Sequence, residues 1–210
     1  MIGLCGAHRT GKTSLAREFA KETGTVFMQT SVSSIFTELG LDPAGTFTFS
    51  QRLDIQEEIL KRLDEAYGKA PLDTWTIVDR TPIDLMGYTL AEAVGDNVKE
   101  EDQQRLKNYV NKCFDVTNRR FSSVILVQSG LPLVHEPGKA ALNAAYIEHL
   151  SSLMFGLLMD ERLETPKFYI RRSQLGMRER IEAVRRTAHQ VAAAQGDQIR
   201  QHLLAGGMLQ

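Results

Sequence analysis

The chain has 210 residues, of which 42% are hydrophobic and 24% are charged, and its formal net charge is −1. These values are ordinary for one globular domain, taken here as 1–210, and the near-neutral charge argues against a field that would recruit nucleic acid. No apolar run approaches the ~20 residues of a membrane span, no signal peptide is recognisable, and Cys5 and Cys113 predict no disulfide framework. We therefore expect a cytoplasmic protein with no membrane partner.

Short apolar strands alternate with amphipathic helices along the chain. Strands are expected at 1–5, 25–28, 74–79, 123–127 and 168–170. Helices are expected at 12–23, 31–39, 50–67, from 82 onward, and at 100–117, 140–163 and 177–194, with Ser50 as N-cap of the third and Thr81 as N-cap of the fourth. A flexible tail is expected at 196–210. The alternation predicts an α/β fold, a parallel sheet with helices on both faces.

The strongest motif lies between the first strand and the first helix, where residues 6–13 match G-x-x-x-x-G-K-[ST]. The backbone freedom of Gly6 and Gly11 lets successive N–H groups curl around phosphate oxygens, and the helix adds its positive N-terminal end. Lys12 supplies an ammonium for the β- and γ-phosphates of ATP, and the Thr13 hydroxyl can ligate Mg²⁺. The candidate ATP-binding residues are Gly6, Ala7, His8, Arg9, Thr10, Gly11, Lys12, Thr13 and Ser14, with His8 and Arg9 acting mainly through backbone N–H groups.

A second pair of candidate residues, Asp79 and Arg80, ends the third strand. Ligands of open parallel sheets bind outside the carboxyl ends of the strands, so this pair faces the γ-phosphate if the first and third strands are neighbours. Asp79 can hold Mg²⁺ through water or accept a proton from a hydroxyl, and Arg80 can grip a phosphate with two hydrogen bonds. Both are candidate catalytic residues, with Asp79 also a metal ligand and Arg80 also an acceptor-binding residue.

Residues 6–13 and 78–85 resemble the P-loop nucleoside and nucleotide kinases, in the group that contains thymidylate-kinase-like proteins. They are most similar to small kinases of bacteria and phages that carry AAA-type ATP-binding domains and are not ring motors. The resemblance implies a three-layer P-loop NTPase fold of nucleotide-kinase type, with ATP and Mg²⁺ as cofactors. It also implies that the Asp-Arg pair contacts the phosphoryl acceptor. Dimers are common among such kinases, so a homodimer is a possible assembly.

The same resemblance implies three further parts of the site. A mobile lid is expected at about 130–145, where Lys139 stands in place of the arginine that related proteins often carry. The acceptor pocket is expected around the helix at 50–67. The last strand leads to the adenine site, while Arg178 and Arg180, further on, are expected to be solvated. The candidate residues are Lys139 for catalysis, Phe47, Gln51, Arg52 and Gln56 for the acceptor, and Arg171 for ATP.

The leading hypothesis is phosphoryl transfer from ATP to a small nucleotide, with a deoxynucleoside monophosphate favoured because the resemblance is strongest around Asp79 and Arg80. A kinase acting on a hydroxyl, of a nucleoside or of a hydroxymethylated base in DNA, remains an alternative. An ATPase switch or a nucleotide-binding regulator without turnover is the alternative of another class. A ring motor would need a helical domain, and the chain after the last strand holds about one helix. The five histidines lack the spacing of a zinc site.

Overall fold

The computed structural model describes residues 1–30, 32–42, 45–71, 73–133 and 143–206, without the side chains of 33, 195 and 197–206. The strands are β1 (Ile2–Cys5), β2 (Val26–Met28), β3 (Thr76–Val78), β4 (Ser123–Val127) and β5 (Lys167–Ile170). The helices are α1 (Lys12–Thr23), α2 (Val32–Glu38), α3 (Phe49–Tyr67), α4 (Pro82–Glu92), α5 (Glu100–Arg120), α6 (Ala144–Leu158) and α7 (Met177–Gly206), with a 3₁₀ turn at Gly95–Asn97.

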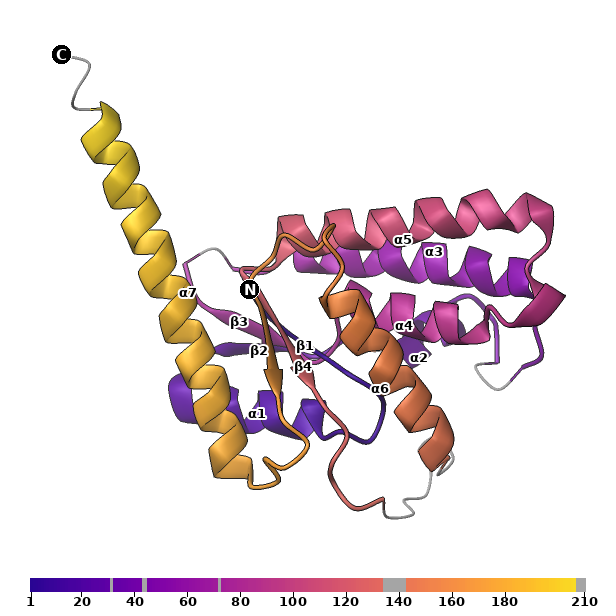
Figure 1. Cartoon of the computed structure of the whole chain (residues 1–210), viewed down its shortest axis with the longest axis horizontal. Coiled ribbons are helices and arrows are strands. Elements are labelled where there is room, and N and C mark those ends of the chain that lie inside the picture. The colour runs from indigo at the N-terminus through magenta and orange to yellow at the C-terminus, as the bar shows by residue number, and fades with distance from the viewer. Residues whose placement is uncertain (31, 43–44, 72, 134–142, 207–210) are drawn as a thin grey trace.

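The five strands form one parallel sheet in the order β2-β3-β1-β4-β5 (Figure 1). The central strand β1 lies between β3 and β4, so that Ile2 pairs with Ile77 on one side and with Ser123 on the other. Parallel pairing brings the carboxyl ends of all five strands to one edge of the sheet. The predicted α/β class and the parallel sheet are confirmed, and β1 and β3 are neighbours, which was the condition for joining the two sequence motifs.

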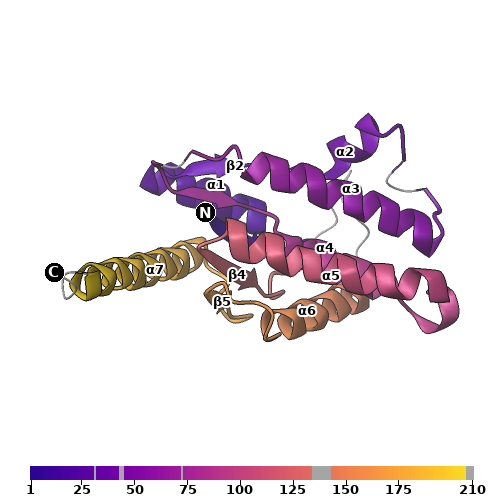
Figure 2. The same cartoon turned by 90° about the horizontal axis from the view of Figure 1, so that it is seen from above.

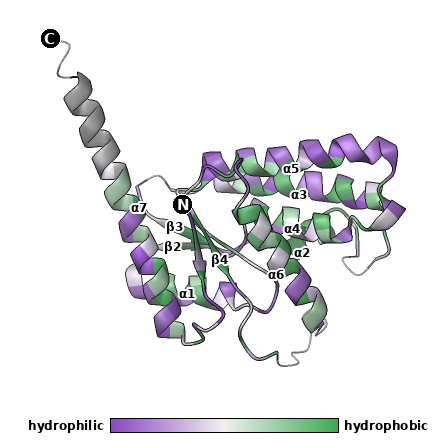
Figure 3. Cartoon of the chain, viewed as in Figure 1, coloured by the Kyte–Doolittle hydropathy of each residue, from purple (hydrophilic) through white to green (hydrophobic). Residues whose placement is uncertain are grey.

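Helices cover both faces of the sheet, which makes three layers. On one face Ile2 and Leu4 of β1 pack against apolar residues of α1 and α7, such as Leu15 and Val184. The opposite face carries the larger cluster, which joins α3, α4, α5 and α6. Hydrophilic residues gather on the outer side of α5, while apolar residues line the sheet (Figure 3). Burial of apolar side chains on both faces is the main favourable contribution to this fold.

Several helix boundaries differ from the expected ones. Thr48, and not Ser50, is the N-cap of α3, because Thr48 and Gln51 form a capping box in which each accepts the other's backbone N–H. Helix α6 begins at Ala144 after the cap residue Asn143 and ends at Leu158, whereas 140–142 lie outside the described residues. Buried Leu163, expected inside that helix, reaches the core from the turn that follows it.

Helix α5 continues to Arg120, three residues beyond its expected end. Helix α7 continues to Gly206 instead of ending at 194, so much of the expected tail has helical backbone. Its C-terminal part extends away from the rest of the molecule, as Figures 1 and 2 show from two directions. Within the part of the chain that the structure describes, no helix is long and apolar enough to cross a membrane.

Candidate active site

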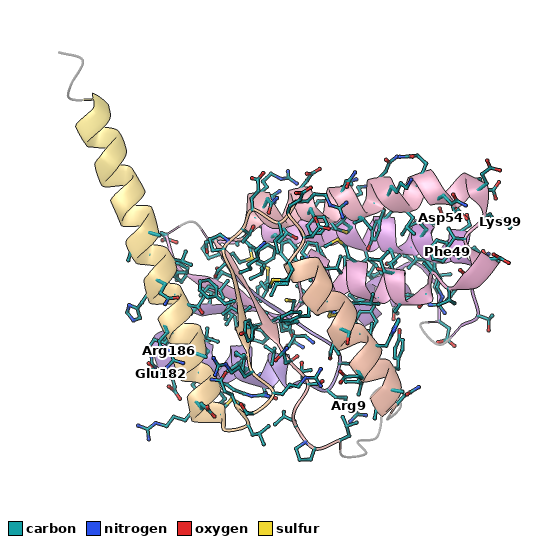
Figure 4. The ribbon with its side chains drawn as sticks, viewed as in Figure 1. Arg9, Phe49, Asp54, Lys99, Glu182 and Arg186 are labelled. Atoms are coloured by element: carbon teal, nitrogen blue, oxygen red, sulfur yellow. The ribbon has the colours of Figure 1, made fainter. Side chains whose placement is uncertain are left out.

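The loop between β1 and α1 has the backbone that a phosphate-binding loop requires. Gly6 has φ 141° and Gly11, the N-cap of α1, has φ 81°. A Cβ on Gly6 would lie 2.5 Å from the carbonyl oxygen of Val127, so only glycine fits there. Among the described residues Arg9 is the only non-glycine with positive φ, at 67°, a strained backbone of the kind that clusters at functional sites. Arg9 projects from the loop at the lower edge of the molecule in Figure 4.

The ammonium group of Lys12 lies on the carbonyl groups of its own loop. Its Nζ donates to Gly6 O at 2.6 Å and to Ala7 O at 2.9 Å. Burial lowers the pKa of Lys12, the nearby carboxylate of Asp84 raises it, and the charge of Arg80 lowers it again. The two cations, Lys12 and Arg80, would attract an anionic ligand such as a triphosphate.

Asp84 supplies the negative charge nearest to Lys12, with Oδ1 3.8 Å from Nζ. Its side chain is 1% exposed and accepts hydrogen bonds from the N–H of Gly6 at 3.1 Å and the N–H of Thr81 at 2.8 Å. Burial raises the pKa of Asp84. Sequence reasoning treated Asp84 only as part of a helix start. In the structure it also ties the first turn of α4 to the phosphate-binding loop.

Asp79, which follows β3, lies directly against Thr13 in the first turn of α1, because β3 is the neighbour of β1 in the sheet. The Thr13 hydroxyl donates to Asp79 Oδ2 at 2.6 Å, and the N–H and hydroxyl of Thr30 lie 3.4 and 3.3 Å from Oδ1. Mg²⁺ prefers oxygen ligands, and this pair of oxygen groups at the end of the loop fits that preference. The residues that would hold the ion are Thr13 directly and Asp79 through water. Thr30 was not identified from the sequence.

Arg80 directly precedes the N-cap of α4, and Tyr88 lies within α4 and contacts the phosphate-binding loop. The guanidinium of Arg80 lies 5.9 Å from the centre of the Tyr88 ring, and the Arg80 carbonyl accepts a hydrogen bond from Tyr67 at 3.0 Å. The hydroxyl of Tyr88 accepts the backbone N–H of His8 at 2.9 Å and lies 3.1 Å from its Nδ1. One N–H expected to face phosphate is therefore engaged by Tyr88. No sequence signal identified Tyr88, since its place beside the loop depends on a contact with a residue 80 positions away.

The imidazole of His8 also has a defined environment. Its ring centre lies 6.3 Å from that of Tyr88 and 6.1 Å from that of Tyr146 on α6. Burial lowers the pKa of His8. The cations Lys12, Arg9 and Arg80 act in the same direction, which favours the neutral ring at pH 7. His8 was expected to act mainly through its backbone N–H, and in the structure its side chain also packs against Tyr88 and Tyr146.

The predicted acceptor residues, which lie on α3 and just before it, differ in their surroundings. Arg52 pairs with Glu92 at 2.6 Å, and its guanidinium lies 5.5 Å from the Phe47 ring. Gln56, one turn further along α3, has a buried Oε1 with no hydrogen-bond partner among the described residues. Gln51 is exposed, and its side chain is used in the capping box with Thr48.

The other residues singled out from the sequence lie on other elements or outside the described residues. Ser14 is exposed in the first turn of α1. Arg171 is exposed at the end of β5 and borders a cavity of about 560 Å³ between β5 and α7. Lys139 and most of the expected lid lie outside the described residues. Arg180, expected to be solvated, is instead 1% exposed and contacts the phosphate-binding loop. Among the described side chains, no group of three His, Cys, Asp or Glu residues could hold a metal ion.

Comparisons with known structures define the class to which this fold and loop belong. Deoxyadenosine kinase from M. mycoides with bound dCMP and dCDP gives a TM-score of 0.62 at 17% identity, over 90% of this chain and 98% of that one. Thymidylate kinase from Candida albicans gives 0.62 at 10% identity, over 90% of each chain. YorR from Bacillus subtilis, in complex with phosphorylated GDP, gives 0.53 at 12% identity, over 90% of this chain and 95% of that one. The chain therefore has the fold of the P-loop nucleoside and nucleotide kinases.

The sequence comparison names the family. A family model described as an AAA domain matches residues 1–123, and because this is more than half of the chain, the protein belongs to that AAA domain family. No curated protein matches the chain. The matched part contains the loop at 6–13 and the Asp79-Arg80 pair, which are the two segments on which the resemblance to P-loop kinases rested.

Proposed function

We propose that this protein transfers the γ-phosphoryl group of ATP to a deoxynucleoside monophosphate. The observation that carries the proposal is a row of three side chains on one face of α4. Asp84, Tyr88 and Glu92 are spaced four residues apart, so they share a helix face, and they contact Lys12, His8 and Arg52 in turn. At 1.5 Å per residue the row is about 12 Å long, the scale of a nucleotide from its phosphate to its base.

The donor half of the site is the phosphate-binding loop. Its N–H groups and the N-terminal end of α1 would bind the phosphates of ATP, and Lys12 would leave its loop carbonyls to meet the β- and γ-oxygens. Mg²⁺ held at Thr13 and Asp79 would neutralise charge that develops on those oxygens. Arg171 remains the candidate for the adenine and Lys139 the candidate for the lid. We expect the protein to position the reactants and stabilise charge, without forming a covalent intermediate.

The acceptor half begins at Arg80. Each carboxylate oxygen of Asp79 lies near a hydroxyl group, Oδ2 near that of Thr13 and Oδ1 near that of Thr30. These contacts suit a metal-holding role better than proton abstraction. A monophosphate is nucleophilic at neutral pH and needs a cationic clamp more than a base. The guanidinium of Arg80, over Tyr88 in the middle of the row, would supply that clamp.

The far end of the row would bind the base. Glu92 and Arg52 are each about one-third exposed, and Arg52 lies over the Phe47 ring, so this end combines an aromatic face with paired polar groups. The unpartnered Oε1 of Gln56 adds a hydrogen-bond acceptor. Aromatic surfaces with a few polar groups are typical of pockets for small ligands. Gln51 is left out of this set because the α3 cap uses its side chain.

The test is a panel of nucleosides, nucleoside monophosphates and hydroxymethylated DNA, each incubated with the protein and Mg-ATP. We expect ADP release that requires a deoxynucleoside monophosphate. Release that requires a nucleoside or the modified DNA would assign a hydroxyl acceptor, and release without any acceptor would assign an ATPase. Arg80→Ala should lower turnover more than Asp79→Asn if the acceptor is a phosphate, and the reverse order would point to a hydroxyl. The exposed Arg178→Ala serves as the charge-matched control.

A further inference from the structure

An arginine of α7 that the reaction scheme does not use lies buried behind the phosphate-binding loop. Arg180 is 1% exposed and is among the largest fully buried side chains among the described residues. Its Nη1 donates to the carbonyl of Thr10 at 2.8 Å, and its Nε donates to the carbonyl of Gln174 at 2.7 Å. Nη1 also lies 3.2 Å from the place that a Cβ on Gly11 would occupy. The guanidinium therefore contacts the part of the loop that leads into α1.

Arg180 forms no ion pair with any carboxylate of the described residues. Its Nη2 is buried and has no hydrogen-bond partner among them, so only Nη1 and Nε are engaged. A buried charge that lacks an ion pair is costly, whereas two carbonyl groups can be satisfied by neutral donors. Burial lowers the pKa of Arg180, and the neighbouring Glu179 offsets only part of this effect. A purely structural role explains the two hydrogen bonds and leaves the positive charge unexplained.

The arginine also joins two loops that border the nucleotide site. The turn after β5 is closed on itself, since the N–H of Arg171 donates to Gln174 Oε1 at 2.8 Å and the N–H of Gln174 donates to Arg171 O at 3.0 Å. Arg180 links this turn to Thr10 of the phosphate-binding loop. Both loops follow strands at the carboxyl edge of the sheet, where nucleotides bind in such folds. Because the Arg180 guanidinium is bonded to both loops, a displacement of the turn after β5 would also displace the phosphate-binding loop, and the reverse.

We propose that Arg180 is a positioning residue for the donor nucleotide, which it serves in two ways without touching it. It holds the loop at Thr10 against the turn after β5, and its charge stabilises the triphosphate from behind the loop. This inference rests on the proposed function only in taking ATP as the ligand of the loop. The triphosphate would supply the negative charge that Arg180 does not find among the described residues.

The experiment compares Arg180→Gln, which keeps a hydrogen-bond donor and loses the charge, with Arg180→Lys, which keeps the charge. Arg178→Gln is the control, because it removes an exposed arginine from the same turn of α7. The Kd for Mg-ATP is measured by calorimetry on the full chain, and folding is checked by circular dichroism. We expect Arg180→Gln to raise the Kd about tenfold, Arg180→Lys to stay within about threefold of wild type, and the control to be unchanged.

A folded Arg180→Gln variant that binds ATP as wild type does would overturn the proposal, and so would an Arg180→Lys variant as weak as Arg180→Gln. If Arg180→Gln does not fold, the Kd of Arg180→Lys for Mg-ATP is the test. A Kd within about threefold of wild type supports the proposal, and a larger Kd overturns it. If neither folds, Arg180 is a structural residue and the proposal fails. Binding of Mg-ATP needs no acceptor, so a protein that binds ATP and phosphorylates nothing would refute the proposed function and leave this comparison intact.

Discussion

The role of Asp79 can be separated from that of a catalytic base by one substitution, Asp79→Asn. Asparagine has nearly the same shape as aspartate and can still accept a hydrogen bond from the Thr13 hydroxyl, which lies 2.6 Å from Oδ2. The free energy of unfolding should therefore change by about 1 kcal/mol or less. What is lost is the negative charge that, in the proposed function, would hold Mg²⁺ through water. Groups that orient a metal ligand contribute about 10- to 100-fold to metal affinity, or about 1.4–2.7 kcal/mol.

The assay is the initial rate of ADP formation at saturating ATP and acceptor, measured over a wide range of free Mg²⁺. We expect the half-saturating Mg²⁺ concentration to rise about 10- to 100-fold for Asp79→Asn, with much of the rate recovered at high Mg²⁺. The exposed Asp73→Asn controls for the loss of one carboxylate. An unchanged Mg²⁺ requirement with a rate about 10²–10⁴-fold lower at every concentration would refute the metal-holding role and support proton abstraction.

Three further outcomes test other parts of the site. Lys12→Ala should lower kcat by about 10²–10³-fold with little change in melting temperature, and wild-type turnover in this variant would exclude the kinase assignment. Gly6→Ala combines φ 141° with a Cβ placed 2.5 Å from Val127 O, so urea unfolding should show a loss of about 3 kcal/mol; an unchanged midpoint would contradict the loop conformation. Burial raises the pKa of Asp84 above its ordinary value of 3.8, so its contribution to stability is largest below that pH and falls as pH rises through the folded-state pKa. Asp84→Asn should therefore gain stability relative to wild type as pH rises from about 4 to 7, and a constant difference across that range would contradict the raised pKa.

The sequence was sufficient where a residue's place depends on a local signal and on one general rule of sheets. The loop at 6–13 and the pair Asp79-Arg80 each follow an apolar strand. Parallel strands share their carboxyl edge, so two local patterns predicted that the loop and the Asp79-Arg80 pair lie at one edge, and the structure places Thr13 against Asp79 across 66 positions. The three-layer fold followed from the same alternation of strands and helices.

The sequence was insufficient where a residue's role is created by its tertiary neighbours. Asp84 has the appearance of an ordinary helix-start acid until α4 packs against the loop, and Tyr88 is one apolar-face residue among several until its hydroxyl meets His8. Arg180 has the polarity of a surface residue, and only the contact with Thr10, 170 positions away, shows that it is buried. The cap of α3 is a different case, because the Thr48-x-x-Gln51 pattern was present in the sequence and the expectation of Ser50 as N-cap did not take it into account.

The central position of β1 determines at what stage of synthesis the phosphate-binding loop can fold. Strand β1 precedes β3 and β4 in the chain and pairs with both, as in Ile2 with Ile77 and with Ser123. Neither partner exists when residues 1–13 emerge, so the phosphate-binding loop cannot reach its native shape until the chain has been synthesised through β4. Such long-range pairing slows folding because the loop-closure entropy is paid before the contacts form. The phosphate-binding loop therefore takes its native shape late in synthesis, although its residues precede both partner strands in the chain.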